Sequence, residues 1–273
     1  MNDVAIIDVW AQRPSRAFLQ QPWLATLNRW TGRRADAGEI TPQQLIGHMD
    51  EAGVDKVLLS AWWGPTGELI SNDSVADLVQ AFPERVVGIA SADLSRPLEA
   101  MRTLRRYVQE YGFKGLRVVP WLWNLPPDDR RYYPLHAACC ELGVPLLTQI
   151  GYTGPLCPSE PGRPIPYLEN VLLDFPELVV VGGHVGFPWF DEVVALCGKF
   201  PGLHVDTSAY VAHRYPASLI EFMKGRGRER VMFGTNYPML TPRRCLAGLD
   251  ELGLDDDTRA LFLSGNARRV FRV

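Results

Sequence analysis

The sequence predicts an α/β fold, a single (β/α)8 TIM barrel that takes in residues 1–273 as one domain. Eight short apolar runs alternate with amphipathic, helix-like segments. After the first, successive runs start about 25 to 35 residues apart, which is the length of a βα unit. The 273 residues also suit such a barrel, for which ~250 residues is typical.

The predicted strands are rich in β-branched residues and nearly continuous in apolar residues. That pattern is typical of parallel strands that are covered on both faces. In chain order they are Val4–Val9, Val54–Ser60, Arg85–Ala90, Phe113–Val119, Val144–Ile150, Leu178–Gly183, Leu203–Thr207 and Arg230–Gly234.

The segments between the strands have apolar residues at helical spacing, so we expect one covering helix after each strand. These helices are Pro42–Ala52, Asn72–Phe82, Leu98–Tyr111, Arg131–Leu142, Pro166–Phe175, Trp189–Phe200, Pro216–Arg226 and Pro242–Leu252, followed by a short one near Asn266–Phe271.

An open, doubly wound sheet is the main alternative fold, but no glycine-rich phosphate-binding turn follows the first strand. No repeat or linker marks a second domain. The longest irregular stretches are Ala11–Thr41, Pro120–Arg130 and Tyr152–Pro164, and each follows a strand. Because a barrel builds its active site at the carboxyl ends of its strands, residues 11–41 are a candidate lid.

The composition excludes several protein classes. Hydrophobic residues make up 47% of the chain, charged residues 22%, and the net charge is -3, without a basic cluster for nucleic acid. No apolar run approaches the ~18 residues of a membrane span, and the start MNDVAIIDVWAQ lacks the features of a secretory signal. The five cysteines form no CxxC pair. We therefore expect a cytoplasmic protein with no membrane or nucleic-acid partner.

Polar and aromatic side chains gather at the predicted strand ends. Trp10 and Gln12 are two positions apart, so both side chains point to the same side of an extended strand. The residues at these ends are Trp10, Gln12, Trp62, Trp63, Asp93, Arg117, Gln149, Tyr152, His184, Ser208, Tyr210 and Asn236.

Arg117 on the fourth strand is expensive to bury unpaired. It is either balanced by a carboxylate such as Asp93 or available to an anionic substrate. The aromatic residues either pack in the core or wall a pocket. The histidines at positions 48, 136, 204 and 213 are expected in structural or solvent-facing roles.

Seven segments carry a family resemblance, and together they span nearly the whole chain. They are Ile7–Asp8, HMDEAGVDKVLL (His48–Leu59), GFKGLRVVP (Gly112–Pro120), GVPLLTQIG (Gly143–Gly151), GGHVGFPWFDE (Gly182–Glu192), VMFGTNYPM (Val231–Met239) and GNARRVF (Gly265–Phe271). In this order they resemble the amidohydrolase-related family, in the branch of 2-amino-3-carboxymuconate-semialdehyde decarboxylase. The resemblance implies a TIM barrel that hydrolyses or decarboxylates a small ring compound.

Metal-binding members of that family have His-x-His at the end of the first strand, a His on the fifth and sixth strands, and an Asp on the eighth. The matching positions here are Trp10, Gln12, Gln149, His184 and Asn236. Indole and amide groups are poor ligands for a tight zinc site. The comparison with the family therefore implies no catalytic metal, and no residue identifies another cofactor.

Two hypotheses of function follow. The first is a metal-independent hydrolase or lyase that acts on a small carboxylated lactone, ester or aromatic acid. Its catalytic residues are His184 as general acid or base, Arg117 and Asn236, and its substrate-binding residues are Trp10, Gln12, Trp62, Gln149, Tyr152 and Tyr210. Pyrone-dicarboxylate lactonases of the family work without metal, although they use an Asp where this chain has Asn236.

The second hypothesis is a catalytically retired barrel that binds a small molecule or a partner subunit. An ordinary metal-dependent hydrolase or decarboxylase is a third, weaker alternative. In each case the expected partner is a small anionic or aromatic molecule, and the family resemblance implies a homodimer.

Overall fold

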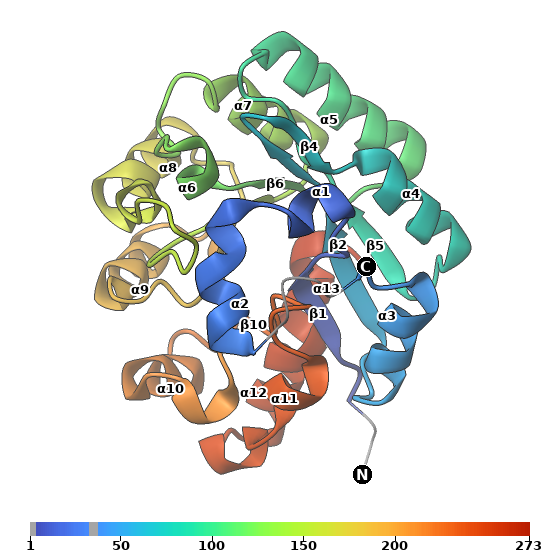
Figure 1. Cartoon of the computed structure of the whole chain (residues 1–273). Coiled ribbons are helices and arrows are strands. Elements are labelled where there is room, and N and C mark those ends of the chain that lie inside the picture. The colour runs from blue at the N-terminus through green and yellow to red at the C-terminus, as the bar shows by residue number, and fades with distance from the viewer. Residues whose placement is uncertain (1–3, 33–37) are drawn as a thin grey trace.

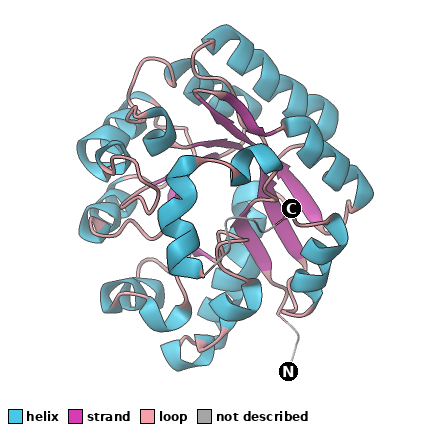
Figure 2. Cartoon of the chain, viewed as in Figure 1, coloured by secondary structure: helices cyan, strands magenta, loops and turns pink. Residues whose placement is uncertain are grey.

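The computed structural model describes residues 4–32 and 38–273. Within them, eight parallel strands form a barrel inside a layer of helices (Figures 1 and 2). The barrel strands are β1 (Ile7–Ala11), β2 (Lys56–Ser60), β5 (Val86–Ile89), β6 (Leu116–Val118), β7 (Leu146–Gln149), β8 (Val180–Gly183), β9 (Leu203–Asp206) and β10 (Val231–Met232). Each lies within or overlaps one predicted strand, and β1 starts three residues later than predicted.

Backbone hydrogen bonds close the strands into a ring. Strands β1, β2 and β5 pair in that order, and β6 to β10 form a second run. The Arg117 amide donates to Ala90 O at 2.7 Å and joins β5 to β6. On the opposite side, the Val9 amide donates to Phe233 O at 3.0 Å and joins β1 to the residue after β10. The predicted α/β TIM barrel is therefore confirmed.

Helices cover the outside of the barrel, and local sequence sets their ends. A capping box between Thr41 and Gln44 starts α3, and Ser71 caps α4. Gly112, with φ +69°, ends α5. The covering helices are α3 (Pro42–Asp50), α4 (Asn72–Ala81), α5 (Pro97–Tyr111), α7 (Tyr133–Leu142), η3 (Pro164–Leu168), α8 (Glu169–Asp174), α9 (Phe190–Lys199), α10 (Ala217–Lys224), α11 (Pro242–Leu246), η5 (Leu249–Leu252), α12 (Asp256–Ala260) and η6 (Leu261–Gly265). The short η4 (Ala212–Arg214) lies at the carboxyl ends of the strands, and α13 (Asn266–Phe271) closes the other end of the barrel.

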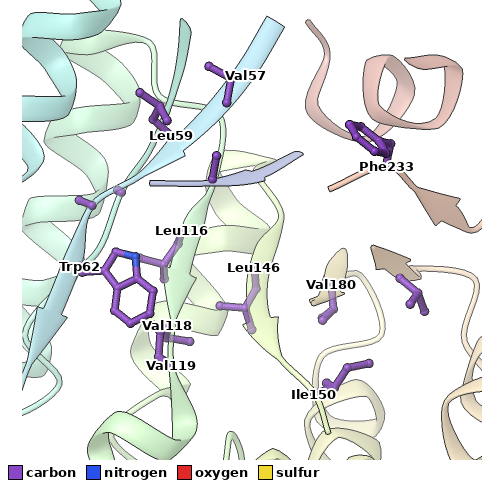
Figure 3. Close-up of a cluster of buried hydrophobic side chains, with 14 of the residues drawn as sticks. Val57, Leu59, Trp62, Leu116, Val118, Val119, Leu146, Ile150, Val180 and Phe233 are labelled. Carbon is purple, nitrogen blue, oxygen red and sulfur yellow. The ribbon is translucent and has the colours of Figure 1, made fainter. Parts of the chain in front are cut away.

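The alternation of side chains along each strand divides the core in two. Residues that point outward pack against the helices, as Val57, Leu59, Leu116, Leu146 and Val180 do (Figure 3). A separate inner cluster fills the barrel, and α13 contributes to it. Its members are Ile7, Val9, Trp10, Leu58, Ile89, Leu147, Val181, Met232, Ala267 and Phe271.

Three parts of the chain differ from the sequence prediction. The segment 11–41, predicted to be irregular, contains α1 (Arg16–Leu19), η1 (Pro22–Leu24) and α2 (Ala25–Thr31), while its residues 33–37 lie outside the described part. The side chain of Ser15 caps α1 and Gly32, with φ +68°, ends α2, so short-range capping outweighs the loop-like composition.

A second difference is α6 (Pro120–Trp123), which begins the predicted loop Pro120–Arg130. The third is a hairpin of β3 (Trp62–Gly64) and β4 (Gly67–Ile70), outside the barrel order and placed between β2 and α4. Across the described residues, no helix combines the length and apolar character needed to cross a bilayer.

Candidate active site

A pocket of about 360 Å³ opens at the carboxyl ends of the barrel strands. Helix α2 lies across this mouth (Figure 1). Residues 16–31, which form α1, η1 and α2, supply six lining residues: Phe18, Trp23, Leu24, Leu27, Trp30 and Thr31. No Asp or Glu of the described residues lines the pocket, whereas Arg117, Arg214 and Arg244 do. The pocket is therefore suited to an anion with an apolar or aromatic body.

Arg117 lies at the floor of the pocket and is 1% exposed. Its guanidinium is sandwiched between the rings of Trp10 and Trp62, at 4.0 and 4.4 Å from their centroids. The Nη1 group donates a hydrogen bond to Gln12 Oε1 at 2.8 Å, and Nε has no partner among the described residues. Burial lowers the pKa of Arg117 to about 9, so the group stays charged at neutral pH.

No carboxylate of the described residues forms an ion pair with Arg117. Asp93, the partner considered from the sequence, accepts hydrogen bonds from Ser95 instead. Asp206 acts on the arginine only as a more distant charge. The pairing of Arg117 with Asp93 considered from the sequence is therefore not formed.

Gln12 connects Arg117 to Asn236. Its Nε2 donates to Asn236 Oδ1 at 3.1 Å and to Tyr237 O at 2.7 Å, while its Oε1 accepts from Arg117. The backbone amide of Asn236 donates to the carbonyl oxygen of Trp10 at 2.7 Å. This network brings together five residues that come from three distant parts of the chain.

His184 lies beside this network, partly accessible from the pocket but below the molecular surface. Its Nδ1 is 2.6 Å from Ser208 Oγ, and its ring packs edge-on against Trp10, with centroids 5.4 Å apart. No hydrogen bond from a described residue occupies Nε2. Burial, and then the charge of Arg117, lower the pKa of His184 to about 3, so the imidazole is neutral near pH 7.

Two buried carboxylates lie close to the pocket floor. Asp206 accepts the Ser208 amide at 2.7 Å, and burial raises its pKa to about 6. Asp8 accepts from the Thr235 hydroxyl at 2.6 Å and from the Trp10 amide at 3.1 Å. Both are fixed by these bonds and neither lines the pocket, so they hold the backbone around the site and do not contact a ligand there.

Strained backbone is concentrated around the site. His184, Val185, Ala209 and Asn236 all adopt positive φ, at 74°, 64°, 67° and 62°. This region is unfavourable for residues other than glycine, above all for β-branched Val185. Such strain is typically retained at functional sites, where it orients side chains. Here it turns the chain just after β8, β9 and β10.

The other predicted site residues occupy two kinds of position. Trp62, Gln149, Tyr152 and Tyr210 line the pocket. The Gln149 amide is already engaged, because it accepts from Trp121 Nε1 at 2.6 Å and donates to Tyr152 O at 3.2 Å. Trp10 does not line the pocket and is fully buried beneath Arg117 and His184.

Several lining residues were not predicted. They include Phe187, His213, Arg214, Met239, Leu240 and Arg244. His213 and Arg214 lie on η4, a short turn that has no sequence signature of its own, and His213 had been expected to have no site role. Proximity to a strand end was the one signal that could have identified them.

The side chains at the five positions where the family resemblance places metal ligands do not form a set of ligands that fits a divalent cation. Gln12 Oε1, Asn236 Oδ1 and Gln149 Oε1 each accept a hydrogen bond from a protein donor. Trp10 contributes an indole that packs on a guanidinium. Within the described residues, no three His, Cys, Asp or Glu side chains are grouped to hold a metal.

Comparisons with known proteins agree with this architecture. The family described as Amidohydrolase matches residues 7–273. An uncharacterised TIM-barrel protein from Bordetella bronchiseptica is 26% identical, with a TM-score of 0.84 over 98% of both chains. A 2,6-dihydroxybenzoate decarboxylase from Rhizobium is 18% identical, with a TM-score of 0.73 over 98% of both chains.

A third solved structure is a probable 2-pyrone-4,6-dicarboxylic acid hydrolase from Acinetobacter baumannii with citric acid bound. It is 19% identical, with a TM-score of 0.69 over 98% of this chain and 99% of the other. At this identity the likeness to the decarboxylase and to the hydrolase concerns the fold.

Proposed function

The chain belongs to the amidohydrolase family, and from this premise we propose that it is a metal-independent hydrolase or lyase of a small carboxylated lactone, ester or aromatic acid. The observation that carries the proposal is Arg117, a buried cation without a carboxylate partner at the floor of an aromatic pocket. A buried charge of this kind is costly unless a ligand of opposite sign completes it.

His184 is the proposed general acid or base. With its Nδ1 proton donated to Ser208 Oγ, the lone pair of Nε2 is free to accept a proton. In lactone or ester hydrolysis, Nε2 takes a proton from the attacking water, and the imidazolium returns it to the leaving alkoxide. In decarboxylation, Nε2 takes a proton from a hydroxyl group of the substrate or from water and passes it to the ring carbon, as the bond to the carboxylate breaks and carbon dioxide leaves.

Hydrogen-bond donors replace the usual Lewis acid in this proposal. Arg117 and the Nδ2 group of Asn236 are positioned to stabilise a developing oxyanion. One such donor is worth about 3 kcal/mol in a preorganised, water-poor site. The rings of Trp62, Tyr152 and Tyr210 contact the apolar body of the substrate.

Turnover in the absence of metal tests the proposal. The protein is purified without immobilised-metal chromatography. It is assayed, with and without a metal chelator, on 2,6-dihydroxybenzoate, 2-pyrone-4,6-dicarboxylate and related lactones. We expect turnover that the chelator leaves unchanged and that His184→Ala lowers about 100-fold. The variant must keep the circular dichroism spectrum and melting temperature of the wild type.

Two outcomes contradict the proposal. Activity that requires an added divalent ion would support an ordinary metal-dependent enzyme. Ligands that raise the melting temperature without any turnover would support the alternative of a retired barrel that only binds. The homodimer and the cytoplasmic location remain predictions, and light scattering on the purified protein tests the first.

A further inference from the structure

Two of the positions where the family resemblance places metal ligands, Trp10 and Gln12, contact Arg117, and a third, Asn236, is hydrogen-bonded to both of them. The Trp10 ring lies 4.0 Å from the guanidinium carbon. Gln12 accepts from Nη1 at 2.8 Å, and its own amide group is held by Asn236 Oδ1 at 3.1 Å and Tyr237 O at 2.7 Å. We call Trp10, Gln12 and Asn236 the cradle.

We infer that the cradle holds Arg117 as a resident cation in place of a metal ion, and that this cation binds an anionic oxygen of the ligand. The inference rests on the proposed function, in which Arg117 stabilises a developing oxyanion, and it adds which residues keep the arginine charged and in place. It makes Gln12 and Asn236 positioning residues that act through the arginine.

The chemistry of the cradle preserves the charge of the guanidinium. An amide oxygen accepts a hydrogen bond without neutralising the donor, whereas a carboxylate at position 12 would form an ion pair. The two indole faces exclude water without adding a full negative charge. An anion that reaches Arg117 therefore meets a full positive charge in a poorly solvated site, where its attraction is strongest.

The cradle also explains why Gln12 is oriented with its oxygen toward Arg117. Its Nε2 has acceptors on the opposite side, at Asn236 Oδ1 and Tyr237 O. With both Nε2 protons directed there, Oε1 is left to face the guanidinium. Asn236 is in turn fixed by its backbone bond to Trp10 O at 2.7 Å.

Gln12→Glu tests the inference because it changes charge and hardly changes shape. Benzoate and benzamide, which differ in charge and little in size, are titrated into the full-length protein and followed by tryptophan fluorescence and calorimetry. We expect the wild type to bind benzoate about tenfold or more tightly than benzamide. Gln12→Glu should abolish that preference, because the new carboxylate pairs with Arg117. Its melting temperature should fall, because the carboxylate cannot donate to Asn236 Oδ1 and Tyr237 O as Nε2 does.

Two further variants complete the experiment. Arg117→Met should also abolish the preference for benzoate, and this variant takes the place of Gln12→Glu in the test if Gln12→Glu does not fold. Gln80→Glu adds the same charge on the exposed face of α4 and should keep the wild-type preference. A wild type that does not prefer benzoate, or a folded Gln12→Glu that still does, overturns the inference. Benzoate preference without turnover of any substrate would contradict only the proposed function.

Discussion

At the scale of single residues, the site combines a charged arginine and a neutral histidine. Arg117 is buried and His184 is half-buried, and the charge of Arg117 contributes to the low pKa of His184. The two residues therefore have different roles: Arg117 supplies a fixed positive charge, and His184 is neutral and can accept a proton at neutral pH. Trp10 contacts both and keeps them apart from bulk water.

The coupling of the two groups predicts a change in titration. Arg117→Met removes a positive charge near His184, so the pKa of His184 should rise from about 3. It should stay below 6.5, because burial is the larger cause and persists. Histidine ring resonances followed by NMR between pH 3 and 8 measure this shift. Arg214→Met, on the pocket rim, is the matched control, and an equal shift there would contradict the assignment.

At the scale of elements, α2 and the loop at residues 152–156 form the roof of the pocket. The Trp30 ring stacks on Tyr152 with centroids 6.5 Å apart, and the Leu156 amide donates to Trp23 O at 3.2 Å. Gly154 leaves room for the side chains of Leu27 and Trp30, since a Cβ there would lie 2.7 Å from Leu27 Cδ2. A small residue at this position lets the two segments meet.

Removal of the stacking contact should loosen the roof. Trp30→Ala deletes a ring that is 55% exposed, so the global stability should fall by only about 1 kcal/mol. Hydrogen exchange of residues 16–31 should nevertheless become about tenfold faster, because local opening follows the lost contact. Leu173→Ala, an equally exposed residue on α8, is the control. Unchanged exchange in Trp30→Ala would show that Trp30 does not hold the roof.

Helix α7 carries a second neutral histidine, and its role is structural. His136 is fully buried, donates from Nε2 to Pro127 O at 2.9 Å, and packs against Tyr132 and Phe175. Burial lowers its pKa to about 4. Between pH 6.5 and 4 the unfolded chain binds a proton that the folded chain does not, so the stability contributed by this residue falls as the pH falls.

His136→Phe should remove that dependence. From pH 7 to pH 5, the wild type should lose about 2 kcal/mol more unfolding free energy than the variant. At pH 7 the variant should be about 1 kcal/mol less stable, because the bond to Pro127 O is lost. Urea unfolding at both pH values measures the difference. Parallel losses in the two proteins would mean that His136 is not buried as a neutral group.

At the scale of the whole molecule, the two ends of the barrel are closed differently. The carboxyl end holds the pocket under α2, while α13 fills the other end. Phe271 and Ala267 enter the inner cluster together with Ile7 and Val9, and Asn266 Nδ2 donates to Val231 O at 2.8 Å. The end of the barrel that α13 fills therefore contributes to stability, and the carboxyl end holds the candidate site.

Phe271→Ala tests this division. The loss of a buried ring should lower the unfolding free energy by about 3 to 5 kcal/mol. Benzoate binding measured well below the melting temperature should be unchanged, because no residue of α13 lines the pocket. Leu98→Ala, on the exposed face of α5, should change stability by less than about 0.5 kcal/mol. A large loss of binding in folded Phe271→Ala would show that the two ends are coupled.

The eight strands could be predicted because buried parallel strands leave continuous apolar runs, as at Leu146–Gln149. Arg117 could be predicted as inward-facing from the alternation of side chains along its strand. Its contact with Gln12, 105 positions away, leaves no local signal, and neither does the bond between Gln12 and Asn236. Helix α2 was missed because Ala25, Leu27 and Trp30 are its only apolar residues, too few to show a helical period.

The closure of the barrel also has a consequence for the way a cell makes this protein. Val9 of strand β1 is translated 224 positions before Phe233, whose carbonyl oxygen accepts a hydrogen bond from the Val9 amide. Asp8 likewise cannot form its hydrogen bond with the Thr235 amide until Thr235, 227 positions later, has been synthesised. Until then the nascent chain is a growing open sheet with an unpaired edge, the kind of surface that recruits foreign strands. Molecular chaperones that shield such edges should therefore matter most during translation of the final strand.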